Sequence, residues 1–281
     1  MFQDLLVYSK ERSPLAFVAV LSLLLFSAGL VRSEIVLFNF VPGWLSMLLF
    51  LFLVRLSDDI ADIPIDKLTH PDRALCCGRI SLLRINLFRF IAVLLLLLIQ
   101  WGSMGKTLFI LVVVSSYSLF FWAKPKLPIL LNVVLLNSSL AVFPIYSGLC
   151  LYGDITLLHL GMGIFFWLGG LAHDFSHCIL DKSALTEGPL NPINEIEPSI
   201  LAWLSLLFFI AAALIGWAMV YFGIAGTAFF VCLLLMTVII LGLETRLILA
   251  PSSSTAKPFY VMGFVFFLLP VLGNLIQIAM H

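Results

Sequence analysis

Charged side chains are scarce in this 281-residue sequence, and their scarcity excludes most soluble folds. Asp, Glu, Lys and Arg make up 11% of the residues and hydrophobic residues 62%, whereas a soluble domain usually has about 25% charged residues. The formal net charge is zero, so the long-range attraction that a nucleic-acid partner needs is absent and none is expected. A chain with so little polar surface has to be covered by membrane lipid.

The sequence also lacks cysteine pairs with the spacing typical of disulfide-rich or zinc-binding small domains. None of the five cysteines forms a C-x-x-C pair or has the spacing of a zinc site. A disulfide framework is therefore not expected, and the cysteines are interpreted as reduced thiols or small apolar residues. They are Cys76, Cys77, Cys150, Cys178 and Cys232.

Long apolar runs dominate the sequence instead. A helix needs about 20 apolar residues to cross a bilayer core of about 30 Å, and lipid forces such a segment to be helical. The first run resembles a signal peptide, but a second follows almost at once, so we interpret it as a retained span. We expect an all-α, polytopic integral membrane protein, with about nine transmembrane helices in a bundle and a cytoplasm-facing polar cavity. The runs are 14–31, 35–56, 85–101, 107–123, 127–149, 155–172, 200–222, 224–245 and 259–280.

The distribution of Lys and Arg predicts the orientation. With the N-terminus in the cytoplasm and nine spans, thirteen of the 15 basic residues fall on the cytoplasmic side, and only Arg32 and Lys106 fall on the far side. We therefore expect a protein of the cell inner membrane or an equivalent membrane, with a cytoplasmic N-terminus and active site. The weakest boundary is at Gly223 and Gly226, where a re-entrant hairpin is the alternative.

Two long polar stretches, 57–84 and 173–199, hold ten of the 15 acidic residues. Both fall on the cytoplasmic side in this topology. The first follows the second run and the other follows the sixth, and this four-span offset indicates two pseudo-equivalent halves. We expect both halves to belong to a single transmembrane domain covering residues 1–281.

The first acidic stretch contains Asp58, Asp59, Asp62 and Asp66. On a continuing helix, Asp62 and Asp66 share one face with either Asp58 or Asp59. Carboxylates this close repel one another, and a hard cation such as Mg²⁺, which also contacts substrate phosphates, removes that cost. Pro64 predicts a bend, with Asp66 just beyond it. The alternative interpretation is a solvated acidic loop.

The second acidic stretch is HDFSHCILDK, in which Asp174, His177, Cys178 and Asp181 share a helical face. Asp174 and Asp181 are suited to a second Mg²⁺, whereas His177 is a poor ligand for a hard cation. A histidine that only forms a hydrogen bond at the membrane surface is the alternative. The string H-D-x-x-H also approaches the zinc-protease motif H-E-x-x-H, with one methylene missing.

A third cluster, YSLFFWAKPK, closes the fourth apolar run. Lys124 and Lys126 are suited to binding a phosphate, and Tyr117 is suited to donating a hydrogen bond to one. An aromatic and basic belt at the membrane interface explains the same residues equally well. Together, the three clusters predict a site that holds an anionic head through metal ions while an apolar tail lies between helices, which describes a prenyl diphosphate.

At these motifs the sequence resembles the UbiA superfamily of intramembrane prenyltransferases. DDIADIPIDKLTHPDRALCCGRIS is similar to the family's N-D-x-x-D-x-x-x-D motif with its downstream H-P-x-R and G-x-I-S. YSLFFWAKPK is similar to Y-S-x(5)-K, and HDFSHCILDK lies where the family has D-x-x-D-x-x-x-D. Asp58 replaces the usual Asn, His177 the middle Asp, Leu180 a common Gly, and Cys76-Cys77 a Pro and a small residue.

The resemblance implies Mg²⁺ as cofactor, a prenyl diphosphate as donor, and a small lipophilic or aromatic acceptor. It implies catalytic roles for Asp59, Asp62, Asp66, Asp174 and Asp181. These five residues and Asp58 are the implied metal ligands. The implied diphosphate-binding residues are Arg73, Arg79, Lys124 and Tyr117.

The first hypothesis for function is Mg²⁺-dependent transfer of a prenyl chain to an aromatic or quinone-precursor acceptor within the membrane. The second is a UbiA-type terpene cyclase, in which the allylic cation closes on its own chain without an acceptor. A non-catalytic binding protein of the same fold is the third, and the zinc protease is the remaining one. The sequence does not specify the acceptor or the length of the donor chain.

Overall fold

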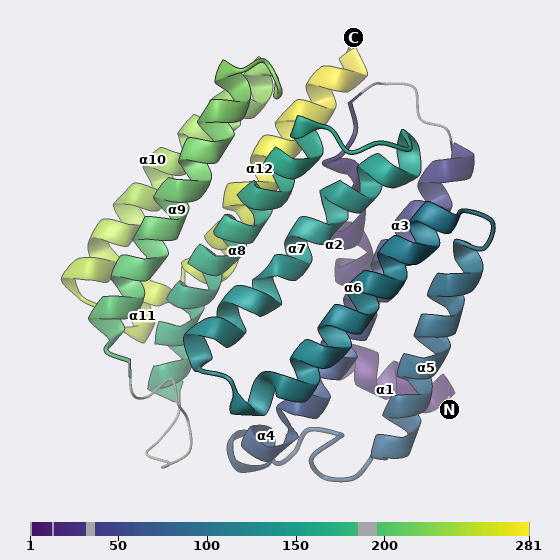
Figure 1. Cartoon of the computed structure of the whole chain (residues 1–281). Helices are drawn as coiled ribbons and strands as arrows, with labels where there is room; N and C mark the ends of the chain where they lie inside the picture. The colour runs from purple at the N-terminus through teal and green to yellow at the C-terminus, as the bar shows by residue number, and fades with distance from the viewer. Residues whose placement is uncertain (1, 13, 32–36, 185–195, 281) are drawn as a thin grey trace. The chain divides into compact units, whose positions relative to one another are not determined.

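The computed structural model describes residues 2–12, 14–31, 37–184 and 196–280, and these residues form helices and short connections without a strand. The chain divides into two compact units, which are described separately. The helices are α1 (Phe2–Arg12), α2 (Leu15–Ser27), α3 (Leu37–Ala61), α4 (Ile63–Thr69), α5 (Leu82–Ile99), α6 (Met104–Ala123), the short η1 (Lys124–Lys126), α7 (Ile129–Leu151), α8 (Leu157–Ala184), α9 (Pro198–Tyr221), α10 (Thr227–Leu249), α11 (Ser253–Ala256) and α12 (Phe259–Met280) (Figure 1).

Among the described residues, seven helices are long and apolar enough to cross a membrane by length and composition. They match seven of the predicted runs, and many of their apolar side chains are exposed, as Leu98, Val112 and Val238 are. The first predicted run corresponds to the shorter apolar helix α2, and the sixth lies within α8. The predicted all-helical integral membrane protein is confirmed. The count of nine spans, the polar cavity and the orientation stay predictions.

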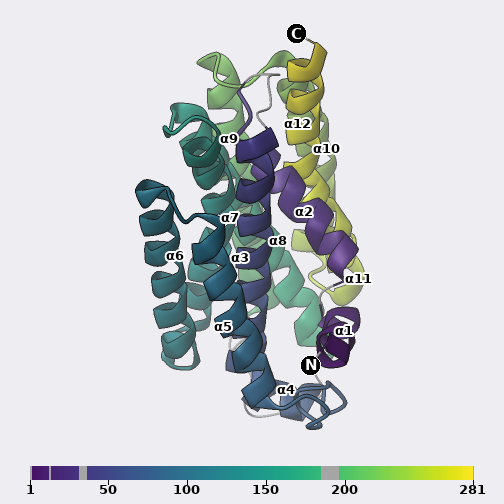
Figure 2. The same cartoon turned by 90° about the vertical axis from the view of Figure 1, so that its right-hand side faces the viewer.

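Unit 1 comprises Met1–Phe26 and Val36–Leu127. In it, α3 packs against both α5 and α6. Apolar side chains from α1, α3, α5 and residues 74–80 form one core, and α1 and α4 lie at the same end of α3 (Figure 2). The buried members of this core are Tyr8, Leu56, Ala74, Ile80, Ile85 and Phe88.

Unit 2 comprises Ser27–Ile35 and Pro128–His281, and α8 is its central helix because it packs against α7, α9 and α12. A buried group of phenylalanines fills the space between these helices. Gly223 has a φ of 68° in the turn between α9 and α10, a conformation that glycine adopts readily. The re-entrant hairpin stays an untested alternative. The phenylalanines are Phe165, Phe166, Phe209, Phe229, Phe259, Phe266 and Phe267.

Both acidic stretches begin on helices rather than on loops. The segment α3 runs on to Ala61 and therefore includes Asp58 and Asp59, and α8 runs on to Ala184. The break predicted near Pro64 is confirmed, since α3 ends before Asp62 and α4 begins with proline in its first turn. The predicted boundaries were too early because hydropathy marks where lipid ends, whereas backbone hydrogen bonds continue the helix further.

Candidate active site

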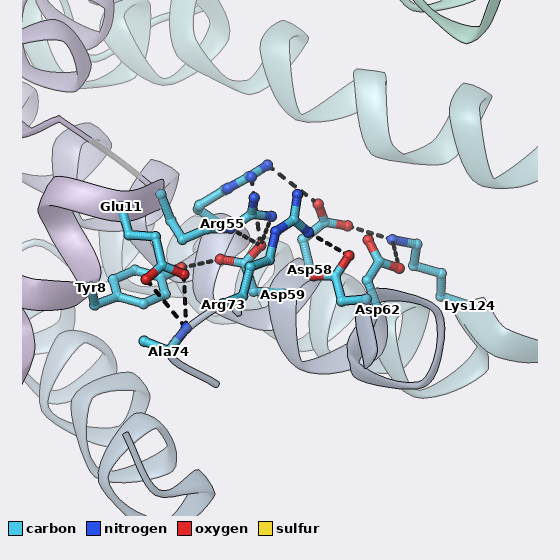
Figure 3. Close-up of polar contacts among 11 residues, drawn as sticks. Tyr8, Glu11, Arg55, Asp58, Asp59, Asp62, Arg73, Ala74 and Lys124 are labelled. Carbon is cyan, nitrogen blue, oxygen red and sulfur yellow. Dashed lines mark hydrogen bonds and ion pairs between the residues drawn. The ribbon is translucent and has the colours of Figure 1, made fainter. Parts of the chain in front are cut away.

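Two carboxylates of the first acidic stretch converge on one lysine. Nζ of Lys124 lies 2.5 Å from Oδ1 of Asp58 and 2.7 Å from Oδ1 of Asp62 (Figure 3). Asp58 is on the last turns of α3, Asp62 follows that helix directly, and Lys124 follows α6, which packs against α3. Chain geometry thus brings two acidic oxygens to a single cationic position.

This pair of carboxylates is electrostatically strained without its cation. Burial and the neighbouring Asp58 carboxylate raise the pKa of Asp62, while the Lys124 ammonium acts in the opposite direction. A guanidinium nitrogen of Arg55 lies 3.6 Å from the second oxygen of Asp58. Positive charge close to both carboxylates therefore offsets their mutual repulsion.

Asp59 faces a different set of partners, on the side of α1. The Tyr8 hydroxyl donates to Oδ2 of Asp59 at 2.5 Å, and Arg12 donates to Oδ1 from Nε at 3.1 Å. In Figure 3, Tyr8 and Asp59 lie together on one side, away from Lys124 on the other. Burial and the Asp59 carboxylate raise the pKa of Tyr8, so its hydroxyl stays a donor.

The N-terminal helix also binds the polar stretch beyond α4. Oε1 of Glu11 accepts a hydrogen bond from the backbone N–H of Ala74 at 2.9 Å, and Oε2 lies 3.4 Å from a guanidinium nitrogen of Arg79. Sequence reasoning missed Tyr8, Glu11 and Arg12. Their partners lie 47 to 68 residues away, so no local spacing could reveal them.

The remaining predicted residues of unit 1 have varied surroundings. Arg73 forms an ion pair with Asp66. Arg79 is exposed and donates to the sulfur of Cys77 at 3.1 Å, so Arg79 lowers the pKa of that thiol. The ring of Tyr117 packs edge-on against Phe50, with centroids 5.5 Å apart. Lys126 lies over the ring of Trp122, 5.0 Å from its centroid, as expected of an interface belt.

The second acidic stretch lies in unit 2, on α8. Nδ2 of Asn137, from α7, donates to Oδ2 of Asp174 at 2.6 Å. Asn137 was not predicted, because a single amide in an apolar run carries no spacing signal. The ring of His177 lies among the rings of His173 and Tyr260, with centroids 6.0 and 5.7 Å away. The side chain of Asp181 lies outside the described residues.

The donor set of Asp58 and Asp62 fits a magnesium ion. Lys124 marks the position where a cation meets both carboxylates, and Mg²⁺ in phosphate-processing sites commonly takes one or two carboxylates, with water and substrate phosphate completing its shell. Within the described ranges, no three or more His, Cys, Asp or Glu residues form a group that holds a metal unaided. The pair therefore suits a metal that arrives with an anionic substrate.

Unit 1 thus combines an apolar helical layer with a carboxylate pair and a lysine at one helix end. No protein-family model matches the chain, and no curated protein matches it either. Three solved structures do. A UbiA homologue from Aeropyrum pernix K1, in its apo form, has a TM-score of 0.73 and 17% identity, over 94% of this chain and 98% of that one.

The second structure, a UbiA homologue from Archaeoglobus fulgidus bound to DMAPP and Mg²⁺, has a TM-score of 0.64 and 15% identity, over 97% of this chain and 99% of that one. The third, a digeranylgeranylglyceryl phosphate synthase, has a TM-score of 0.68 and 14% identity, over 96% of both chains. The chain has the fold of the UbiA superfamily, so the resemblance inferred from the motifs is confirmed at the level of the fold. The convergence of the two acidic stretches and the roles of the site residues stay predictions.

Proposed function

We propose that this protein is a UbiA-type prenyltransferase that moves a prenyl chain from a prenyl diphosphate to an aromatic or quinone-precursor acceptor within the membrane. The observation that carries the proposal is the meeting of Asp58 and Asp62 at Nζ of Lys124. The UbiA fold supports it, as does the presence of DMAPP, a prenyl diphosphate, and Mg²⁺ in one homologue of that fold.

In this proposal the aspartates bind the metal and the basic residues neutralise the diphosphate. Asp58 and Asp62 would hold Mg²⁺, which supplies the positive charge that a departing diphosphate needs. Lys124 then leaves the carboxylates and neutralises phosphate oxygens, because an ammonium on a flexible stem follows the nearest excess of negative charge. Arg73 and Arg79 extend the basic surface of the same polar stretch. The allylic C–O bond breaks, and the diphosphate keeps the electron pair. An electron-rich acceptor carbon then bonds to the allylic carbon, and the hydrogen on that acceptor carbon leaves as a proton to solvent.

Asp59, Asp66, Asp174 and Asp181 have supporting places in this proposal. Asp59 anchors α1, and Asp66 anchors Arg73, so both shape the polar stretch around the carboxylate pair. Asp174 and Asp181 provide the second metal site that the motif implies. The single domain of residues 1–281 and the cytoplasmic position of the site belong to the same proposal.

The test uses the purified protein in detergent with Mg²⁺ and prenyl diphosphates of several lengths, with and without aromatic acceptors. Pyrophosphate release that requires an acceptor is the expected result. Asp72→Asn is the matched control for Asp62→Asn, because Asp72 is an exposed acid of the same stretch. The Asp72→Asn variant is expected to keep full turnover. Release of pyrophosphate with a cyclic hydrocarbon and no acceptor would support the terpene cyclase instead. No release across the panel would contradict both enzymes and favour a binding protein.

A further inference from the structure

A carboxyl group is buried inside unit 2, far along the chain from either acidic stretch. Glu244 lies on α10 and has no exposed surface. Its Oε1 is 2.6 Å from the Ser205 hydroxyl on α9, and its Oε2 has no hydrogen-bond partner among the described residues. Acidic residues inside apolar helices are costly and usually have a function, and the proposed reaction does not use this one.

The hydrogen atoms around Ser205 determine the protonation state of Glu244. The Ser205 oxygen lies 2.9 Å from the carbonyl oxygen of Ala172 on α8, in addition to its contact with Glu244. A serine hydroxyl has one hydrogen, and a carbonyl oxygen only accepts. Two separate hydrogen bonds, each with its own hydrogen, form only if Ser205 donates to Ala172 and Glu244 donates to Ser205. Glu244 must then carry a proton.

The charges around α10 lead to the same conclusion. This helix packs against α9, α11 and α12, and none of the three contains Asp, Glu, Lys, Arg or His. Arg246 on α10 itself is exposed, and no cation among the described residues pairs with Glu244. On α8, the Nδ1 atom of His173 contacts the carbonyl oxygen of Phe259 at 3.0 Å and so is bonded elsewhere than at Glu244. An isolated ionised carboxylate is expensive to bury, so the neutral acid is favoured.

The hydrogen bonds that begin at Glu244 lead through Ser205 to the segment of α8 that carries Asp174. Ala172 is bound through Ser205, His173 through the carbonyl of Phe259 on α12, and Asp174 through Asn137 on α7. Three consecutive residues are thus each bound to a different helix. Gly263 makes the second contact possible, because a Cβ at that position would collide with the His173 ring.

We propose that Glu244 is a protonated positioning residue, which donates to Ser205 and through it fixes the segment of α8 that carries Asp174. It touches no substrate, and it acts by setting the direction of the second acidic stretch. The catalytic consequence rests on the proposed prenyl transfer, whereas the protonated state does not.

Infrared spectroscopy of the purified protein in detergent tests the protonated state. At neutral pH, wild-type protein should show the carbonyl stretch of a buried carboxylic acid, and Glu244→Gln should lack it. A wild-type spectrum identical to that of Glu244→Gln in this region would overturn the proposal. This measurement needs no turnover, so it decides the proposal even if no prenyl diphosphate is a substrate.

Kinetics and thermal stability test the positioning role. Glu244→Gln retains a donor for Ser205 and should keep near wild-type turnover and Mg²⁺ requirement. Glu244→Leu and Ser205→Ala remove the donors at the two positions, and each should lower turnover about tenfold and raise the Mg²⁺ requirement, since small misplacements near a reacting group are costly. The double variant should be no worse than either single one, because both break the same chain.

Thr237→Val is a matched control on α10, because among the described residues the Thr237 hydroxyl donates within its own helix, to the carbonyl of Leu233. It should leave the Mg²⁺ requirement unchanged. An equal loss in Glu244→Gln and Glu244→Leu, or additive losses in the double variant, would overturn the positioning role. If the wild-type protein turns over no substrate, the same ranking of the variants is read from their melting temperatures.

Discussion

The two acidic stretches are held in place by different chemistry. In unit 1, Asp58 and Asp62 meet the Lys124 ammonium, and Asp59 meets the Arg12 guanidinium. In unit 2, the neutral amide of Asn137 donates to Asp174. A carboxylate pair that already holds a cation can exchange it for a metal ion and substrate, whereas a neutral amide sets the direction of a side chain without supplying charge. The comparison predicts that metal binding depends most strongly on unit 1.

The largest effect is expected from Asp62→Asn, which removes one charge of the pair and keeps the shape of the side chain. Turnover should fall by about 100-fold or more, since the charge that stabilises the leaving group is lost. Pyrophosphate release measures this, and the protein should insert and purify normally. Near-normal release would remove the metal-site argument for unit 1.

The second-largest effect is expected from replacing Lys124, whose ammonium contacts Asp58 and Asp62. Lys124→Met leaves the buried Asp58 carboxylate and the half-buried Asp62 carboxylate without their ammonium. This should lower the free energy of unfolding by about 2 kcal/mol, less than at a fully buried pair. Added Mg²⁺ should restore the melting temperature in detergent more strongly than it raises that of the wild type. Lys126→Met is the control, because Lys126 contacts the ring of Trp122 and no Mg²⁺-dependent recovery is expected there. A recovery that is equal in the two variants would contradict the exchange of lysine for metal.

A smaller effect should follow from restoring the family's carboxylate in unit 2. His177→Asp should raise turnover severalfold or lower the Mg²⁺ concentration needed for half-maximal activity, because carboxylate oxygen is a better ligand for Mg²⁺ than imidazole. A magnesium titration of activity measures both. If turnover falls and the Mg²⁺ concentration needed for half-maximal activity rises, His177 has its own function in this protein and the second site is not a weakened form of the usual one.

The smallest effect is expected on the α1 side of the first stretch. Tyr8→Phe removes one hydrogen bond to Asp59, which should cost about 1 kcal/mol of stability, and it should leave the Mg²⁺ requirement unchanged. Chemical denaturation and the magnesium titration together measure this. A strong shift of the Mg²⁺ requirement would place Asp59 with the metal ligands, rather than with the anchor of α1.

The sequence predicted the helical membrane fold because a bilayer requires apolar helices of defined length, and it located both acidic stretches because their carboxylates interrupt apolar runs. It left open which aspartates share a face. The structure answers that question for Asp58 and Asp62, which are four residues apart and both contact Nζ of Lys124. Lys124 lies 66 and 62 residues away from them, so local spacing could not identify it as their shared partner.

The sequence also could not predict contacts between segments that lie far apart along the chain. Tyr8 and Asp59 lie 51 residues apart, and Ser205 and Glu244 lie 39 apart, so nothing in their local sequence links them. Glu244 did have a signal of its own, since it is an acidic residue inside an apolar run. Its partner and its proton could be assigned only from the positions of the surrounding oxygens.

The most direct test of the central claim is to locate the metal. Crystals grown with Mn²⁺ in place of Mg²⁺ and a non-hydrolysable prenyl diphosphate analogue would give anomalous scattering from the metal alone. The account predicts a peak within coordination distance of the Asp58 and Asp62 carboxylates, with the Lys124 ammonium moved onto the diphosphate. A peak elsewhere, with Lys124 still bound to both aspartates, would contradict it.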